Sequence, residues 1–219
     1  MSNIAHTIQL ITLMAVPMLL AVVCHEVAHG YVAYLLGDPT AKNAGRLTLN
    51  PIKHLDFLGT LTFIVTQMIG WAKPVPVDSR YFKDQRKGVI LVSLAGPMTN
   101  LFLAFLFTIL SRLIPHFITI IPPEWQQTIF VPVFEMAKLG IQINLILCLF
   151  NLIPIPPLDG SQILAALLPP HAAYQFMQFG RYGFLIILAL AIFGLLGRIL
   201  LPGVQFLYMT MLAATSWIS

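Results

Sequence analysis

The first 36 residues contain a single charged side chain, and such a run restricts the chain to folds that suit a lipid environment. No Asp, Glu, Lys or Arg occurs between Met1 and Cys24, and apolar residues continue after a short polar motif to Leu36. Across the chain, charged residues make up 9% and hydrophobic residues 58%, whereas globular proteins carry about 25% charged residues. These charges are too few to cover a surface in water, so we predict an all-α protein that crosses the membrane several times.

Uncharged runs of about 20 residues mark the expected membrane-spanning helices. The first span is predicted at residues 8–36, where Pro17 can kink the helix. The last uncharged run, residues 201–218, either spans the membrane or lies along its surface, because Pro202 and Gly203 interrupt it early. Three further spans are expected between these two, at residues 89–110, 139–158 and 182–197.

Basic loops flank a short apolar segment at residues 57–70. The net charge of +4 gathers in such loops, a pattern typical of the cytoplasmic side of membrane proteins rather than of a nucleic-acid-binding surface. If both loops are cytoplasmic, the 14-residue segment enters the membrane and returns on the same side. We therefore predict a re-entrant element, with short β-strands at residues 45–49, which alternate in polarity, and 73–77, which prolines extend.

The polar motif in the first span is His25-Glu26-Val27-Ala28-His29. Residues four apart on a helix share a face, so the imidazoles of His25 and His29 can bind one metal ion. Glu26 stands where it can take a proton from a metal-bound water. The alternative is a chance pair of buried histidines that neighbouring groups satisfy, and the cost of placing ionisable groups in lipid disfavours it.

A catalytic zinc ion usually takes three protein ligands, so a third ligand is required. If the first span starts outside, His25 and His29 lie in its cytoplasmic half, and the third span returns Asp159 to the same depth. Three prolines between Asn151 and Asp159 unwind the chain there, and Gly160 permits a close approach. Asp159 in an interfacial turn or helix cap is the alternative, and the matching depth favours metal binding in the cytoplasmic half.

Three motifs, in this order along the chain, resemble those of the site-2 protease family of intramembrane zinc metalloproteases. They are His25–His29, the Gly-Pro-Met-Thr-Asn stretch Gly96–Asn100, and Asn151–Gly160. Residues 45–51, Gly-Arg-Leu-Thr-Leu-Asn-Pro, and residues 73–77, Lys-Pro-Val-Pro-Val, further resemble the compact prokaryotic members that lack a PDZ domain.

This resemblance implies the domain organisation. A core of three transmembrane helices that carries the zinc site would occupy residues 8–165, and one or two extra helices would follow in residues 166–219. The whole of residues 1–219 is expected to form a single integral membrane domain.

The resemblance also implies the chemistry: hydrolysis of peptide bonds within or near transmembrane segments of membrane-protein substrates, as in regulated intramembrane proteolysis. A single zinc ion would lower the pKa of its water toward about 7, and Glu26 would move the proton to the leaving amine. The zinc ligands would be His25, His29 and Asp159. Asn100 and Asn151 match polar positions of the family motifs, and they bind substrate or an oxyanion, or they join helices through hydrogen bonds.

A membrane metal-ion transporter is the main alternative, because intramembrane histidines and acidic residues also build ion pathways. The sequence has no repeated half and only one metal-binding cluster, which disfavours a transporter. A catalytically silent scaffold is disfavoured by the presence of both Glu26 and Asp159. We therefore expect a multi-pass protein of the cell membrane whose partners are transmembrane substrates and the lipid bilayer, with no nucleic acid.

Overall fold

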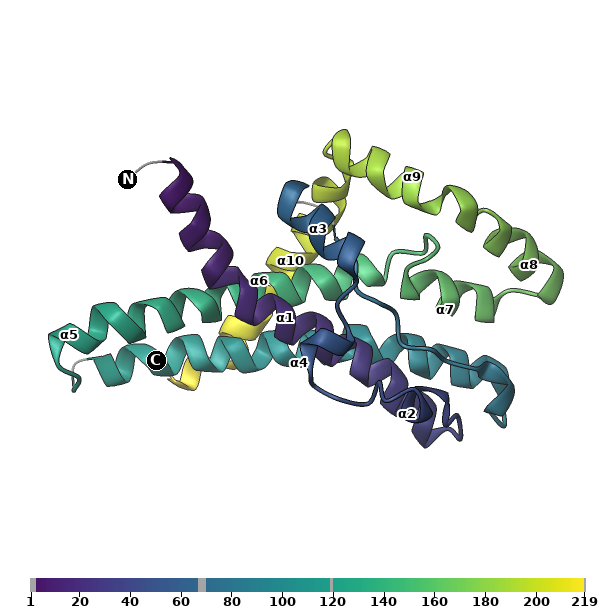
Figure 1. Cartoon of the computed structure of the whole chain (residues 1–219), viewed down its shortest axis with the longest axis horizontal. Coiled ribbons are helices and arrows are strands. Elements are labelled where there is room, and N and C mark those ends of the chain that lie inside the picture. The colour runs from purple at the N-terminus through teal and green to yellow at the C-terminus, as the bar shows by residue number, and fades with distance from the viewer. Residues whose placement is uncertain (1–2, 67–69, 119, 219) are drawn as a thin grey trace. The chain divides into compact units, whose positions relative to one another are not determined.

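A computed structural model describes residues 3–66, 70–118 and 120–218, and these residues are predominantly helical (Figure 1). The four longest helices are α1 (Asn3–Leu35), α4 (Gln85–Ile118), α6 (Val131–Asn151) and α10 (Leu195–Ala214). The shorter α-helices are α2 (Thr40–Asn43), α3 (Phe57–Thr66), α5 (Pro123–Trp125), α7 (Asp159–Leu167), α8 (Pro170–Gln178) and α9 (Gly180–Ile192). Single turns of 3₁₀ helix lie at Pro51–Lys53, Ser79–Tyr81 and Ser216–Ile218, and a π-helical turn lies at Gln126–Phe130.

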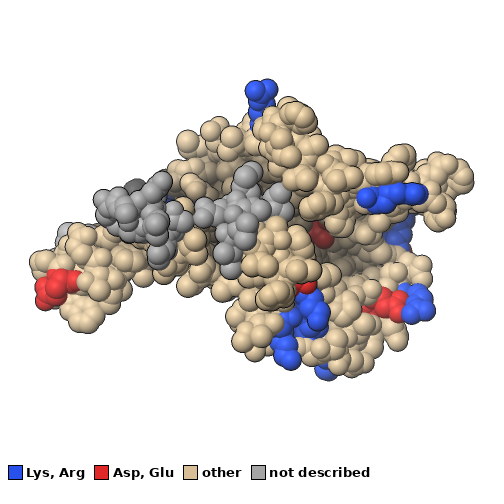
Figure 2. Space-filling view, turned by 45° about the horizontal axis from the view of Figure 1, so that its top comes forward, with Lys and Arg blue, Asp and Glu red and all other residues tan. Residues whose placement is uncertain are grey.

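Within the described residues, four helical stretches are long and apolar enough to cross a membrane, which confirms the predicted class of polytopic membrane protein. They are Gln9–Leu35, Gln85–Phe117, Pro123–Asn151 and Leu195–Ala214. A fifth span is formed if α8 and α9, bent by 57°, count as one crossing. The face of the molecule in Figure 2 is mostly free of Lys, Arg, Asp and Glu, as a lipid-facing surface requires.

Two predicted spans differ from the observed helices for local reasons. The span expected at residues 182–197 ends at Ile192, because Gly194 adopts a left-handed conformation (φ +68°) that separates α9 from α10. The span expected at residues 89–110 is longer, because α4 covers Gln85–Ile118 and continues without a break through Gly96-Pro97. A proline removes only one helical hydrogen bond, and backbone groups in lipid have no partner other than the helix itself.

Contacts divide the chain into two compact units, one of Met1–Ala21, Asn100–Phe150 and Ala191–Ser219, the other of Val22–Thr99 and Asn151–Leu190. The core of the first unit contains Ala104 of α4, Ile141 and Leu145 of α6, and Met211 of α10. The last helix, which carries none of the family motifs, therefore contributes to a buried core. The expectation that residues 1–219 form a single domain stays a prediction.

The second unit holds the motifs His25–His29 and Asn151–Gly160. Ala33 of α1 and Val92 of α4 form its buried cluster together with Phe82, which lies between the Ser79–Tyr81 turn and the start of α4. At Gly88 an added Cβ would lie 2.3 Å from the Phe82 ring, so glycine lets this aromatic side chain pack directly on the α4 backbone.

The short β-strands predicted at residues 45–49 and 73–77 are wrong, because the described residues contain no strand, only an isolated antiparallel bridge between Leu55 and Ala72. Residues 73–77 are extended, as their prolines require, but Pro74 and Pro76 have no N–H for a ladder. The side chains of Arg46 and Glu26 bind the carbonyls of Lys73 and Pro74 and the N–H of Val75 instead. The re-entrant path predicted for residues 57–70 stays a prediction: α3 covers Phe57–Thr66, and residues 67–69 lie outside the described residues.

Candidate metal centre and active site

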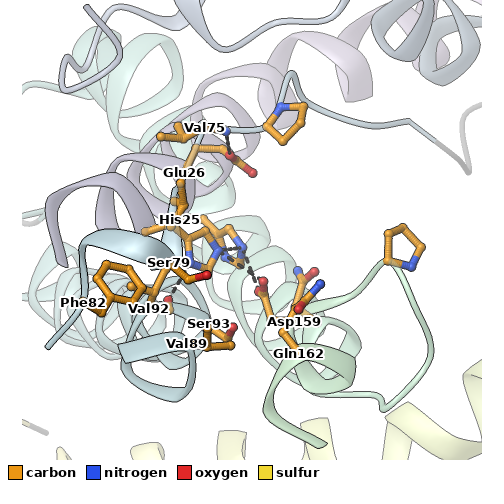
Figure 3. A pocket seen from close by; sticks show the side chains of 15 residues that line it. His25, Glu26, Val75, Ser79, Phe82, Val89, Val92, Ser93, Asp159 and Gln162 are labelled. Atoms are coloured by element: carbon orange, nitrogen blue, oxygen red, sulfur yellow. Dashed lines mark hydrogen bonds and ion pairs between the residues drawn. The ribbon is translucent and has the colours of Figure 1, made fainter. Parts of the chain in front are cut away.

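Two histidines and one aspartate of the second unit bring their ligand atoms together (Figure 3). His25 and His29 lie one turn apart on α1, and Asp159 is the first residue of α7. The Nε2 atoms of the two histidines are 3.0 Å apart. The carboxylate oxygens of Asp159 lie 3.2 Å from Nε2 of His25 and 3.4 Å from Nε2 of His29.

These separations, two of which run to different oxygens of Asp159, are close to those around a tetrahedral zinc ion. Ligand atoms about 2.0–2.2 Å from zinc and at tetrahedral angles lie roughly 3.3 Å from one another. The Asp159 Oδ2 atom is buried and has no hydrogen-bond partner among the described residues, and His25 Nε2 lies 3.2 Å from it. A buried carboxylate oxygen without a donor is costly, and a cation beside it would remove that cost.

The ring of His29 is oriented for metal binding by α4. Its Nδ1 lies 2.7 Å from the backbone carbonyl of Val92. A carbonyl can only accept, so Nδ1 carries the proton and Nε2 is left with its lone pair. A metal-binding histidine typically has such a partner on its other nitrogen. No pattern in the sequence identifies Val92, because every residue has a backbone carbonyl and this contact requires no particular side chain.

Gly96 lets α4 approach the two imidazoles. A Cβ atom added at Gly96 would lie 2.5 Å from Cε1 of His25 and 2.5 Å from Nε2 of His29. Both distances are far below van der Waals contact, so any larger residue collides with the candidate ligands. The sequence draws attention to Gly96 as part of a motif, but its contact with the histidines becomes visible only in three dimensions.

Asp159 is held in place by the turn that precedes α7. At Gly160 an added Cβ would lie 2.2 Å from the carbonyl oxygen of Leu152, so the predicted close approach exists and is made to the backbone of this turn. The Ser161 hydroxyl donates to the carbonyl of Leu158 at 2.6 Å. These contacts fix the start of α7 and hold the Asp159 carboxylate beside His25 and His29.

Glu26 is bound by the backbone rather than by another side chain. One of its carboxylate oxygens accepts the N–H of Val75 at 2.9 Å (Figure 3). This hydrogen bond fixes the carboxylate beside the imidazoles and leaves its second oxygen available.

The two asparagines named from the motifs occupy different settings. Asn151, at the end of α6, lines the site cavity of the second unit. Asn100 is fully buried in the first unit, where its amide nitrogen donates to the Ala21 carbonyl at 3.2 Å and to Asn144 Oδ1 at 2.9 Å. The hydrogen bonds of Asn100 are those that the helix-joining alternative expects. A substrate or oxyanion role for either residue stays a prediction.

A cavity of about 440 Å³ opens beside the three candidate ligands and Glu26. Ser79, Ser93 on α4 and Gln162 on α7 also line it with polar side chains, and none of the three was singled out in the sequence. Gln162 follows Asp159 by three positions, so helical spacing alone could have placed it on the same face. Val75 and Val77 give the cavity an apolar edge. The cavity thus joins potential hydrolytic groups to a surface that suits an apolar peptide.

Comparison with known proteins gives one family. The profile of peptidase family M50 matches residues 13–193. YwhC of Bacillus subtilis is 41% identical over 197 residues, which cover 90% of this chain and 88% of that protein. Rip2 of Mycolicibacterium smegmatis is 30% identical over 185 residues, which cover 82% of this chain and 66% of that protein. Both relatives bear the name "Putative zinc metalloprotease". No solved structure gives a match.

Proposed function

This chain belongs to peptidase family M50, and from that premise we propose that it cleaves transmembrane proteins with one zinc ion held by His25, His29 and Asp159. The observation that carries the proposal is the cluster of His25, His29 and Asp159, in which one ligand atom from each residue lies within 4.8 Å of the other two, beside a glutamate on the same helix as the histidines. That combination is the one expected for a metallopeptidase of the His-Glu-x-x-His type.

The residues of the chain then have distinct roles in hydrolysis. Zinc, when bound, supplies a Lewis acid that polarises the scissile carbonyl and acidifies a water molecule. Glu26 accepts the proton of the attacking water and passes it to the leaving amine, so one carboxylate serves as base and then as acid. The Val75 N–H keeps that carboxylate beside the reacting groups. Asn151 lies on the wall of the same cavity, where its amide can bind substrate backbone or a developing oxyanion.

We further propose a core of three transmembrane helices within residues 8–165, made from α1, α4 and the α6–α7 connection, with residues 166–219 as additional helices of the same membrane domain. The basic segments on either side of residues 57–70 support a cytoplasmic location for that face, and hence an active site in the cytoplasmic half. The names of the relatives favour the protease over the metal-ion transporter.

The proposal is tested with purified protein reconstituted in vesicles. The test substrates are single-span proteins with a Gly-Pro pair in the helix and a fluorophore at each end, because such a helix unwinds readily. We expect about one zinc per chain by elemental mass spectrometry, cleavage inside the labelled helix, and no zinc flux. Zinc flux into the vesicles without cleavage would instead favour the transporter.

A transmembrane substrate must leave its helical form before hydrolysis, because each carbonyl in a helix is hydrogen-bonded internally. Residues 73–77 are extended and Val75 and Val77 line the cavity, which supports a role in binding the unwound substrate as an added strand. In an extended chain the N–H groups of alternate residues face the same side. The N–H of Val77 therefore faces the same side as the N–H of Val75, which binds Glu26. The Val77 N–H is thus placed to bind the backbone of an extended substrate.

Val77→Pro should therefore lower the cleavage rate of the test substrate about three- to tenfold, the value of one lost hydrogen bond, with zinc content unchanged. The matched control is Lys83→Pro, because Lys83 is exposed, lies in the same loop and follows a residue with extended backbone. If Val77→Pro cleaves as fast as Lys83→Pro, substrate does not pair at this position.

A further inference from the structure

We propose that Arg46 is a positioning residue of the active site: its buried guanidinium holds residues 73–78, here named the strap, so that the Val75 N–H can orient Glu26. This inference deepens the proposed protease function and rests on it for its catalytic consequence. Arg46 belongs to the Gly-Arg-Leu-Thr-Leu-Asn-Pro stretch, to which the mechanism above gives no role.

The guanidinium of Arg46 bridges two consecutive carbonyls of the strap. Its Nη2 donates to the carbonyl of Lys73 at 2.6 Å, and its Nη1 donates to the carbonyl of Pro74 at 3.2 Å. These carbonyls immediately precede Val75, whose N–H belongs to the same peptide unit as the Pro74 carbonyl. The planar fork of arginine suits such a pair of acceptors and fixes the orientation of that peptide plane.

The cost of burying this cation indicates a specific purpose. Arg46 is only 6% exposed, and its Nε is buried with no hydrogen-bond partner in the described part of the chain. No described carboxylate lies within ion-pair distance of it, since the ion pairs of the described residues all involve other groups. A buried charge without a counter-charge is destabilising, so fold stability alone gives no reason for an arginine here.

The rest of the strap is attached by its N–H groups. The N–H of Lys73 donates to the His54 carbonyl at 2.9 Å, and that of Asp78 donates to a carboxylate oxygen of Asp38 at 2.7 Å. Asp38 is fully buried and also accepts the N–H of Thr40 at 2.9 Å. The two ends of the strap are thus held through their own N–H groups, and its middle is held through the carbonyls of Lys73 and Pro74, which bind Arg46.

The strap also packs directly on the helix that carries the histidines. A Cβ at Gly30 would lie 2.8 Å from Val75 Cγ1, so the Val75 side chain rests on the α1 backbone one residue after His29. With Val75 placed by packing and its peptide plane placed by Arg46, the N–H points at Glu26. A displacement of about 1 Å at a catalytic group can cost about 100-fold in rate, so an effect through the strap can be large.

The experiment replaces Arg46 with Ala in the full-length, zinc-loaded protein. We expect kcat for the test substrate to fall about 10- to 100-fold while zinc content stays at the wild-type value. Hydrogen exchange of the Lys73, Val75 and Asp78 amides should accelerate, while exchange in α1 and α4 stays unchanged. A fold that is merely loosened would accelerate exchange throughout.

Two further measurements separate positioning from general damage. Arg46→Lys keeps the charge but cannot bridge two carbonyls, so it should recover only part of the rate. Added methylguanidinium should raise the rate of Arg46→Ala and not that of Arg46→Lys, whose side chain fills the site. The matched control is Arg198→Ala, an exposed arginine of α10, which should leave rate and exchange unchanged.

Two outcomes overturn the inference: wild-type kcat in Arg46→Ala, or loss of zinc and protection throughout the protein in both Arg46 variants. The exchange measurement needs no substrate. If the wild-type protein cleaves no test substrate but Arg46→Ala still frees the strap amides, the proposed protease function fails while the structural role of Arg46 stands.

Discussion

Replacing Glu26 with Gln is expected to lower cleavage of the test substrate by at least about 100-fold while zinc remains bound at the wild-type level. An amide cannot take a proton from water, and general acid–base catalysis typically contributes about 10²–10⁴ in rate. The substitution changes little else, because the Gln oxygen can still accept the Val75 N–H that Glu26 accepts at 2.9 Å. The strap and the histidines should therefore keep their positions. Cleavage is measured by separation of the two fluorophores, and zinc by elemental mass spectrometry.

The control for this variant is Glu135→Gln. Glu135 lies on α6 with 40% of its side chain exposed and pairs with Lys138 at 2.8 Å, so the same chemical change occurs outside the active site. Its cleavage rate should match the wild type. A Glu26→Gln protein that cleaves within tenfold of the control would remove Glu26 from the reaction, and a variant that loses zinc would make Glu26 a determinant of metal binding.

The proximity of the candidate ligands could be predicted from the sequence because it follows from two simple regularities. Helical spacing puts His25 and His29 on one face, and the alternation of membrane spans returns Asp159 to the same depth. Both regularities hold whatever the details of packing, and the structure brings the three groups within 3.0–3.4 Å of one another. The class of polytopic membrane protein could also be predicted from the sequence, because several long uncharged runs cannot all be buried away from water in a soluble fold of this size.

The groups that orient these residues could not be predicted, because they are contacts between distant segments. Val92 acts through its carbonyl, and Gly96 acts through the absence of a side chain. Arg46 reaches across 27 and 28 positions to two carbonyls of the strap. That contact also explains the wrong prediction of β-strands: alternation and prolines do indicate extended chain, but side chains of Arg46 and Glu26 take the backbone groups that a ladder would use.

The hydrogen-bonded pair Asn100 and Asn144 in the first unit is a second contact that could not be predicted from the sequence. Asn100 stands out in its motif, but its partner Asn144 lies in an ordinary apolar run, and only their separation of 2.9 Å identifies it. Asn144 in turn donates to the Gly140 carbonyl at 2.8 Å, and a Cβ at Gly140 would lie 2.7 Å from the Phe107 ring. Close helix packing and buried amides thus occur together, as is common in membrane proteins.

Replacing Gly96 with Ala is expected to reduce zinc affinity by at least about tenfold and to lower cleavage accordingly, the size of effect seen when a group that supports a metal ligand is lost. The new methyl group would lie 2.5 Å from Nε2 of His29, the atom with the free lone pair. Relief requires the imidazoles to rotate or α4 to move away, and either change separates His29 from the Val92 carbonyl. Gly96→Val should have a larger effect because its two further methyl groups extend into the same space.

The higher helix propensity of Ala should stabilise α4, whereas the collision with the histidines should weaken zinc binding, so the two effects can be told apart. Exchanging Gly for Ala within a helix stabilises it by about 1 kcal/mol, so a weaker fold cannot explain weaker zinc binding by Gly96→Ala. Gly197→Ala in α10 is the matched control, because it makes the same change in a helix and no atom lies within 4 Å of its added Cβ. Titration with a zinc-buffering chelator measures both affinities. Equal affinities would show that α4 does not confine the histidines, whereas loss in Gly96→Ala alone identifies this glycine as part of the metal centre.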